Sequence, residues 1–348
     1  MTQVNTGVTT ASGAVVAGHR LGFDGAVERS LVHRHAASEV FLTDHVALGG
    51  DRFAVAARLP SAHRYFNDDP LSPALIDPML LLECSRQAGT LVAHCHLGVP
   101  MDTAFLITEW AIELDDESLA TPRDPGELTM VIEARDLKRR GERLLGATLV
   151  SELYLAGRRV GTSTVIAGYP TRAGYESFRT LRRSSPAPLS DGMPRHRLGT
   201  PPESRTVGRT LEENVTLCGV RRADGQIVAD LDVPVEHPVF YDHPLDHVPA
   251  TALLEAARQA ALLALTSGPG AAGEEAGRRR VKVLRARFHR FVELDSPTEV
   301  SARLDQAGNC HSVAVAFEQG GATACDCEVV VSTPSASPVP PAVALGGR

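Results

Sequence analysis

The stretch Leu81-Leu82-Glu83-Cys84-Ser85-Arg86-Gln87-Ala88 occurs a second time in this chain, as Leu253-Leu254-Glu255-Ala256-Ala257-Arg258-Gln259-Ala260. The two glutamates are separated by 172 positions, and so are the two arginines, so both copies share one register. Each copy predicts a helix that is apolar nearly all the way round, which is typical of a helix enclosed by other structure. A repeated buried helix predicts a repeated fold.

The composition is that of a globular protein with two domains. The 348 residues are 43% hydrophobic, and the formal net charge is −7, which argues against binding nucleic acid by phosphate neutralisation. The six cysteines form no C-x-x-C pair, as expected for reduced thiols. We find no signal peptide and no apolar stretch long enough to cross a membrane. We therefore expect a soluble cytoplasmic protein that binds neither nucleic acid nor a membrane.

Hydrophobic periodicity gives the same order of elements twice. Alternating patterns predict strands before and after each helix. In the first half we expect strands at 39–48 and 52–59, a helix at 77–97, and strands at 103–114, 128–137, 144–155 and 159–168. In the second half we expect strands at 215–220 and 226–233, a helix at 249–266, and strands at 281–294, 298–304, 312–318 and 323–331.

This order predicts an α+β protein with a tandem (double) hot-dog fold, in which each repeat is a long central helix wrapped by a curved antiparallel sheet. The two repeats would pack as an internal pseudo-dimer, which is compatible with a monomer. A Pro-, Arg- and Ser-rich stretch separates them and reads as a linker. We expect a flexible segment at 1–28, repeats at 29–170 and 206–332, a linker at 171–205, and a disordered tail at 333–348.

Each helix carries a glutamate, an arginine and a glutamine at i, i+3 and i+4, and therefore on one face. The first set is Glu83, Arg86 and Gln87, and the second is Glu255, Arg258 and Gln259. An ion pair in apolar surroundings is costly unless it is satisfied or used. Both sets are therefore candidates for a functional site. The alternative is a pair of buried salt bridges that only stabilise the fold.

A histidine-containing loop, Asp242-His243-Pro244-Leu245-Asp246-His247, directly precedes the second helix. Free backbone N–H groups at a helix N-terminus can stabilise an oxyanion, and His243 or His247 can act as acid or base beside it. The alternative is a pair of histidines that cap turns. We expect no metal site, because Pro244 prevents a helical i, i+4 histidine pair and no cysteine lies nearby.

The corresponding loop of the first half lacks this histidine. When Phe66 is aligned with Phe240 and Pro70 with Pro244, Asp69 takes the position of His243. We expect structural roles for His63, just before this loop, and for Cys84 in the helix core. His94 and His96 close the first helix, where a cation is favourable. The two halves are therefore not chemically equal.

The chain resembles the A-factor synthase family, the γ-butyrolactone biosynthesis enzymes of actinomycetes. The matching segments run through both halves: Val32-His33-Arg34, Glu39-Val40-Phe41-Leu42-Thr43-Asp44, Phe53-Ala54-Val55-Ala56-Ala57, Gly98-Val99-Pro100, both helices, and the loop from Asp242 to Pro249. The resemblance implies a tandem relative of the hot-dog dehydratases. It further implies transfer of a β-ketoacyl group from acyl carrier protein to the hydroxyl of dihydroxyacetone phosphate, with no cofactor.

This reaction needs a base, an oxyanion hole and a cation for the phosphate. We expect Glu255, Glu83 and His243 to be catalytic, and Arg258, Arg86, Gln259, Gln87 and His247 to bind substrate. Glu255 and Arg258 are the first choice because their repeat holds the histidine loop. The dehydratases carry Pro-Gly at the helix entrance, where this chain has Pro249-Ala250. A hot-dog thioesterase or dehydratase, and a non-catalytic acyl-binding regulator, are the alternatives.

Overall fold

The computed structural model describes residues 7–10, 13–70, 75–115, 126–181, 183, 185–194, 198–266, 279–306 and 310–332. Six strands belong to the first repeat: β4 (Leu42–Gly49), β5 (Arg52–Arg58), β6 (Leu106–Leu114), β7 (Glu127–Arg140), β8 (Arg143–Leu155) and β9 (Arg158–Gly168). Six belong to the second: β10 (Leu217–Ala223), β11 (Gln226–Leu231), β12 (Arg280–Phe288), β13 (Glu299–Gln306), β14 (Cys310–Gln319) and β15 (Ala322–Ser332). These bounds confirm the predicted strands with shifts of a few residues at their ends.

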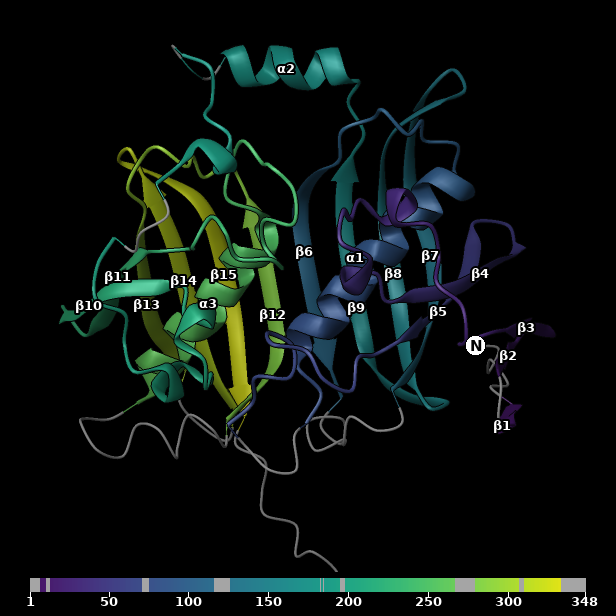
Figure 1. The fold of residues 1–348 in the computed structure, drawn as a ribbon, viewed down its shortest axis with the longest axis horizontal. Helices are drawn as coiled ribbons and strands as arrows, with labels where there is room; N and C mark the ends of the chain where they lie inside the picture. The colour runs from purple at the N-terminus through teal and green to yellow at the C-terminus, as the bar shows by residue number, and fades with distance from the viewer. Residues whose placement is uncertain are drawn as a thin grey trace, which may run out of the picture.

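The twelve strands form one antiparallel sheet in the order β10-β11-β13-β14-β15-β12-β6-β9-β8-β7-β5-β4. Each half of the sheet curls around one long helix, α1 (Pro78–Cys95) in the first repeat and α3 (Ala250–Leu265) in the second (Figure 1). Most residues of both helices are buried, as their all-round apolar pattern predicted. The structure therefore has the tandem hot-dog fold.

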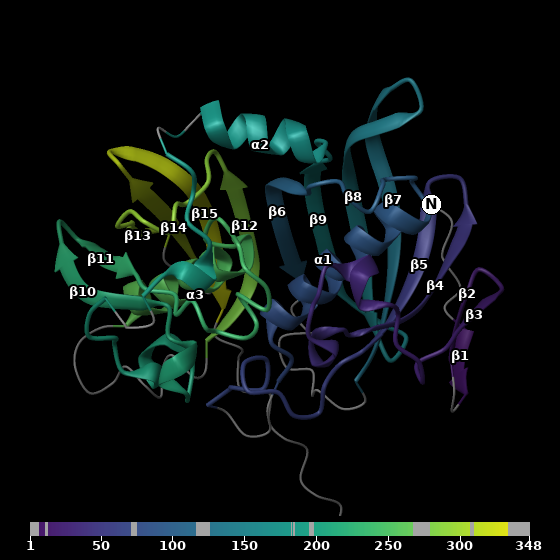
Figure 2. The same cartoon turned by 45° about the horizontal axis from the view of Figure 1, so that its top comes forward.

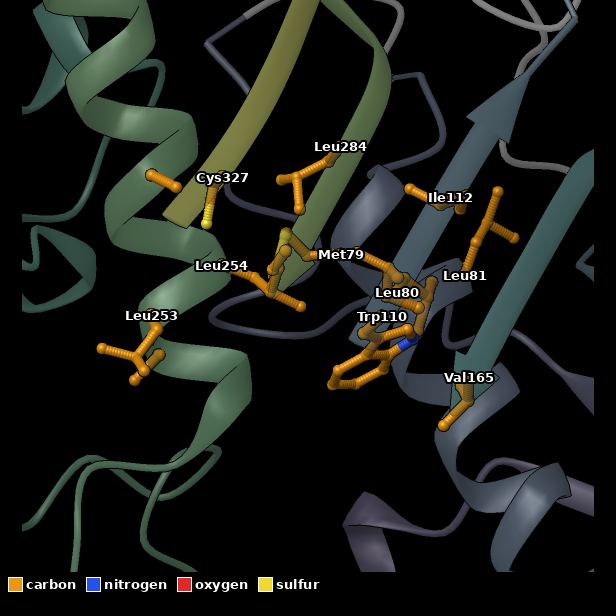
Figure 3. Packing of buried hydrophobic residues seen from close by; sticks show 14 of the residues in the cluster. Met79, Leu80, Leu81, Trp110, Ile112, Val165, Leu253, Leu254, Leu284 and Cys327 are labelled. Atoms are coloured by element: carbon orange, nitrogen blue, oxygen red, sulfur yellow. The ribbon is translucent and has the colours of Figure 1, made fainter. Parts of the chain in front are cut away.

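The two repeats meet edge to edge at β6 and β12, where Glu109 pairs with Arg287 and Glu113 with Val283. Behind this pairing, apolar side chains of both repeats form one cluster. Trp110 and Leu80 from the first repeat lie close to the seam, with Leu254 and Leu284 of the second repeat across from them (Figure 3). One sheet and one core make the repeats an internal pseudo-dimer.

The N-terminal segment differs from the expectation of a flexible stretch. β1 (Gly7–Thr10), β2 (Gly13–Val16) and β3 (His19–Leu21) form a small sheet. Val16, Leu21 and Phe23 are buried in a cluster with Ala54, Ala56 and Val131. These apolar side chains cover the outer face of β5 and β7, which holds the segment in place. The expected disordered tail at 333–348 lies outside the described residues.

The predicted linker contains a helix that its composition did not reveal. α2 (Arg172–Leu181) lies across one end of the molecule and spans both halves of the sheet (Figures 1 and 2). The five prolines and several serines of residues 171–205 suggested irregular chain. All five prolines follow α2, which leaves the helix itself free of proline. Among the described helices, none is long and apolar enough to span a membrane.

Candidate active site

Glu83, in the middle of α1, is 1% exposed and is held between two guanidinium groups. Arg86 donates from Nε to Oε2 at 2.9 Å and from Nη2 to Oε1 at 2.7 Å. Arg34, which follows a short 3₁₀ turn at Arg29–Val32, places Nη2 2.9 Å from Oε1. Gln87 donates to the same oxygen at 2.7 Å. We call this set, Glu83, Arg34, Arg86 and Gln87, the first cluster.

The first cluster makes Glu83 a poor proton acceptor. Burial alone would raise the pKa of Glu83, but Arg34 and Arg86 and the hydrogen bonds to its carboxylate outweigh burial and lower the pKa to about 2. A general base works best when its pKa lies near the operating pH. The expectation that Glu83 is the base is therefore not favoured by its geometry, which suits a carboxylate that orients Arg86.

The second repeat builds an equivalent set around Glu255, which is 0% exposed. Arg209 and Arg258 both donate to its carboxylate, at distances from 2.7 to 2.9 Å. Gln259 donates at 2.6 Å, and the Tyr65 hydroxyl donates at 3.2 Å. The two arginines lower the pKa of Glu255 against the effect of burial. We call Glu255, Arg209, Arg258 and Gln259 the second cluster.

The histidine loop lies beside the first cluster, although it belongs to the second repeat. The Oδ2 atom of Asp242 accepts the backbone N–H of His35 at 2.8 Å, and its Oδ1 atom lies 3.7 Å from Arg34. His243 Nδ1 lies 2.5 Å from Asp242 Oδ1. The preference for Glu255 and Arg258 assumed that the loop serves its own helix. The structure instead brings His243 to Arg86, because each pre-helix loop packs on the opposite repeat.

A cavity of about 260 Å³ lies between the repeats and is lined by Arg86, His243, His247 and the first residues of α3. Its apolar wall comes from both halves and includes Phe105, Trp110, Leu149, Val165, Val248 and Leu253. The Arg86 side chain is 18% exposed, and no described residue hydrogen-bonds to its Nη1 atom. The cavity thus combines an apolar wall with a cation and two histidines.

The N-terminus of α3 opens into this cavity without a side-chain cap. Pro249 is the N-cap residue, and the first intrahelical bonds come from the N–H groups of Ala252 and Leu253. The N–H groups of Ala250 and Thr251 have no partner among the described residues. Uncapped N–H groups at the start of a long helix favour a negatively charged oxygen.

A second histidine of the loop is also oriented by the aspartate before it. His247 lines the cavity, and its Nδ1 atom lies 2.6 Å from Asp246 Oδ1. A carboxylate only accepts, so this contact places a proton on Nδ1 and leaves Nε2 for a ligand. His243 is oriented in the same way by Asp242. The loop therefore presents two aspartate–histidine pairs.

Gln87 and Gln259 do not line the cavity. Gln87 accepts the backbone N–H of Phe41 and donates to the carbonyl of Glu39, and Gln259 does the same with Thr216 and Asn214. Both glutamines therefore tie their helix to the strand region before it. Their predicted role in substrate binding is not favoured by these contacts.

The contacts of His63 fit the structural role expected for it, and the expected place of Cys84 in the core is confirmed. His63 contacts Glu39 at 3.1 Å and accepts backbone N–H groups of its own turn. Cys84 is buried, and burial raises the pKa of its thiol. No group of three or more possible metal ligands occurs within the described ranges.

Sequence reasoning did not single out Arg34 or Asp242 as site residues. Arg34 follows a turn of the first repeat that packs on α1, whereas Asp242 reaches Arg34 through the packing of the two repeats. The segment Val32-His33-Arg34 did carry a signal, because a short turn followed by arginine recurs at Val207-Gly208-Arg209. Recognising that this turn and its arginine also occur twice would have paired each glutamate with its second arginine.

Comparisons with known proteins agree with this architecture. A family model described as the A-factor biosynthesis hotdog domain (AfsA) matches residues 18–168 and 195–333. A 2-oxo-3-(phosphooxy)propyl 3-oxoalkanoate synthase of Streptomyces virginiae is 33% identical over 79% of this chain and 86% of its own length. A Streptomyces griseus protein of the same name is 33% identical over 82% of this chain and 88% of its own.

Among solved structures, an acyl-ACP thioesterase from Bacteroides thetaiotaomicron aligns with a TM-score of 0.43 and 12% identity. The alignment covers 81% of this chain and 98% of that one. The family match covers both repeats, and the relatives named above align over most of their length. The chain therefore belongs to the A-factor biosynthesis hotdog domain family.

Proposed function

We propose that the protein is an acyltransferase that joins a 3-oxoacyl chain, delivered as an acyl carrier protein thioester, to the hydroxyl of dihydroxyacetone phosphate. The product would be the 2-oxo-3-(phosphooxy)propyl 3-oxoalkanoate for which its relatives are named. One observation carries the proposal. An oriented histidine, an uncapped helix N-terminus and an arginine with a free edge line one cavity that also has an apolar wall.

His243 is the base in this proposal. Its Nδ1 atom is held by Asp242, so the Nε2 atom is left to take the proton of the acceptor hydroxyl. Burial alone would raise the pKa of Asp242, but the hydrogen bond from His243 and the charge of Arg34 lower it to about 2. Asp242 thus stays ionised and stabilises the imidazolium that forms when His243 accepts a proton.

The N–H groups of Ala250 and Thr251 serve as the oxyanion hole. When the hydroxyl oxygen attacks the thioester carbon, negative charge develops on the carbonyl oxygen. The C–S bond then breaks, and the proton held by His243 passes to the leaving thiolate. Ala250 stands where the dehydratases have glycine, and its N–H group remains available as a donor.

Arg86 binds the phosphate of the acceptor. A guanidinium offers several donors in one plane, and a phosphate dianion accepts them in a charge-assisted way. Glu83 occupies the Nε and Nη2 atoms of Arg86 and fixes the plane of the guanidinium. The remaining Nη1 edge is then available to the ligand. In this account the glutamate positions the cation, and the histidine does the proton transfer.

The experiment is an incubation of the purified protein with a 3-oxoacyl carrier protein and dihydroxyacetone phosphate, followed by mass spectrometry. We expect the mass of the phosphorylated ester, and none when dihydroxyacetone phosphate is omitted. Release of the free 3-oxo acid alone would identify a thioesterase and contradict the proposal. Replacing the carrier protein by coenzyme A tests the donor, for which we expect a higher KM.

A further inference from the structure

The linker helix α2 lies directly against the histidine loop of the cavity, although it belongs to neither repeat. Tyr175 and Arg179 are one helical turn apart and face the same side of α2. Both reach the carboxylate of Asp246. The Tyr175 hydroxyl lies 2.7 Å from Oδ1 and 2.9 Å from Oδ2, and Arg179 Nε donates to Oδ2 at 2.9 Å.

Asp246 connects α2 to the cavity through His247. Its Oδ1 atom accepts the Nδ1 proton of His247 at 2.6 Å, and the ring of His247 packs 4.7 Å from that of Phe291. Arg179 covers the same Phe291 ring, with its guanidinium carbon 4.3 Å from the centroid. The imidazole of His247 is therefore held at one edge by a carboxylate and is also contacted by an aromatic ring. Both of these partners are in turn held by α2.

The contact between Arg179 and Asp246 is not needed to neutralise the charge of Arg179. Arg179 already forms a two-pronged pair with Glu293, with both distances at 2.8 Å, and its Nη2 atom also donates to the backbone carbonyl of Asp246. Asp246 therefore does not supply a counter-charge that Arg179 would otherwise lack. The contact instead fixes the position of the Asp246 carboxylate. Tyr175 likewise contributes no charge, because burial raises the pKa of its hydroxyl and keeps it protonated.

We propose that α2 is a working part of the active site, with Tyr175 and Arg179 as positioning residues that fix Asp246 and through it aim the Nε2 atom of His247 at the bound phosphate-bearing acceptor. This inference rests on the proposed function, in which the same cavity takes dihydroxyacetone phosphate. The two histidines of the loop are then oriented by aspartates that different parts of the molecule hold in place. The backbone of the first repeat holds Asp242, and the linker helix holds Asp246.

Tyr175→Phe tests this with the least disturbance, since it removes the hydroxyl and keeps the ring that packs on Phe291. We expect the KM for dihydroxyacetone phosphate to rise about 5- to 10-fold while kcat changes less than about 2-fold, as for the net loss of one ordinary hydrogen bond. Tyr154→Phe is the matched control, because Tyr154 also binds a carboxylate, Glu152, on the remote strand β8. We expect Tyr154→Phe to leave both constants unchanged.

A double-mutant cycle separates positioning from a general structural effect. In a His247→Ala background, Tyr175→Phe should change the KM by less than about 2-fold, because the residue through which it acts is gone. The same 5- to 10-fold rise in that background would overturn the inference. So would an unchanged KM in the Tyr175→Phe single variant.

Imidazole nitrogen NMR of the ligand-free protein gives a readout that does not depend on the reaction. We expect His247 to be protonated at Nδ1 in the unaltered protein, and to become a mixture of tautomers in Tyr175→Phe and Arg179→Gln. An unchanged tautomer in both variants would overturn the positioning role. If the protein transfers no acyl chain, the proposed function fails, and this spectrum still decides whether α2 orients His247.

Discussion

The two glutamate clusters are built by the same set of contacts and differ in what surrounds them. In the first cluster, Arg34 donates to the carbonyl of Val239 at 2.8 Å, and its counterpart Arg209 donates to the carbonyl of Tyr65 at the same distance. Each carbonyl belongs to the opposite repeat. The duplicated ion pairs therefore also join the two halves, whether or not chemistry takes place beside them.

The surroundings of the second cluster are closed. Asp69 takes the position that His243 has beside the first cluster. The cavity beside Arg258 has a volume of only about 40 Å³. Leu262 of α3 takes the position that Thr90 has in α1. Leu262 packs so closely on Gly208 that a Cβ added to this glycine would lie 3.0 Å from the Cδ1 atom of Leu262. The comparison shows that the Glu-x-x-Arg-Gln pattern belongs to the structure that both repeats share. The residues around the pattern decide whether there is room for a ligand.

The N-termini of the two helices differ in the same sense. At α1, the Asp77 carboxylate accepts the Met79 N–H at 2.9 Å and also binds Arg209, and Pro78 has no N–H to offer. At α3 the equivalent positions are Pro249, Ala250 and Thr251, which leave two N–H groups open. One helix start is therefore filled by the protein itself, and the other is available to a substrate oxygen.

The largest effect is expected from removing the histidine that distinguishes the two loops. His243→Ala should lower kcat about 10³-fold, within the range of roughly 10² to 10⁴ that general acid–base catalysis contributes. The change at the equivalent position, Asp69→Ala, should alter kcat less than about 2-fold. Steady-state kinetics of both variants checks this. An equal loss in both would mean that the two clefts are equivalent.

The next effect concerns stability in the closed cleft. Glu255→Gln removes the carboxylate that pairs with buried Arg258 and leaves Arg209 with Asp77 alone. Removal of one partner of a buried pair costs about 3–5 kcal/mol. Urea unfolding should show this loss. At a temperature where the variant remains folded, its kcat should stay within about 2-fold of the unaltered protein. A selective loss of kcat in the folded variant would instead support Glu255 as a base.

A third change transfers the cap of α1 to α3. Pro249→Asp should place a carboxylate on the Thr251 N–H and lower kcat about 10²-fold, as for loss of one oxyanion-hole donor. The same cap should stabilise α3 by about 1 kcal/mol in thermal unfolding. Pro249→Ala is the control, since it adds no carboxylate. Full activity in Pro249→Asp would exclude these N–H groups from the reaction.

The smallest effect is a change of stability in acid. The pKa of Glu83 is lowered from 4.5 to about 2 in the folded protein, so the unfolded chain binds this proton first as the pH falls. The resulting stabilisation is present above pH 4.5 and is lost as the pH falls toward 2. A pKa shift is worth about 1.4 kcal/mol per unit, so the whole shift is worth about 3.5 kcal/mol, of which about 2 kcal/mol is lost between pH 5 and pH 3. Urea unfolding between pH 3 and 5 should show a shallower pH dependence in Glu83→Gln than in the unaltered protein, and equal slopes would contradict this account.

The fold followed from the sequence because its main signal is local. The apolar pattern around Glu83 and Glu255 identified two enclosed helices, and the alternation on either side identified the strands that wrap them. The flexible N-terminus was a wrong expectation for residues such as Leu21 and Phe23. Their burial depends on the outer face of the first sheet, which the sequence pattern alone does not place.

The site was only partly predictable because its residues meet across the two repeats. His243, Arg86 and the open start of the second helix were each identified from local patterns. Their grouping was not, because sequence proximity suggested that His243 serves Glu255. The contribution of Tyr175 and Arg179 was hidden for a similar reason, since their partner Asp246 lies about seventy residues further along the chain.

We place the proposed reaction in the cavity lined by Arg86, the histidine loop and the start of α3. A crystal structure of the protein with dihydroxyacetone phosphate and a 3-oxoacyl pantetheine amide, a stable analogue of the thioester, tests it most directly. We predict the phosphate at Arg86, the amide carbonyl at the N–H groups of Ala250 and Thr251, and the hydroxyl near His243. A ligand bound beside Arg258 and Asp69 would contradict the account.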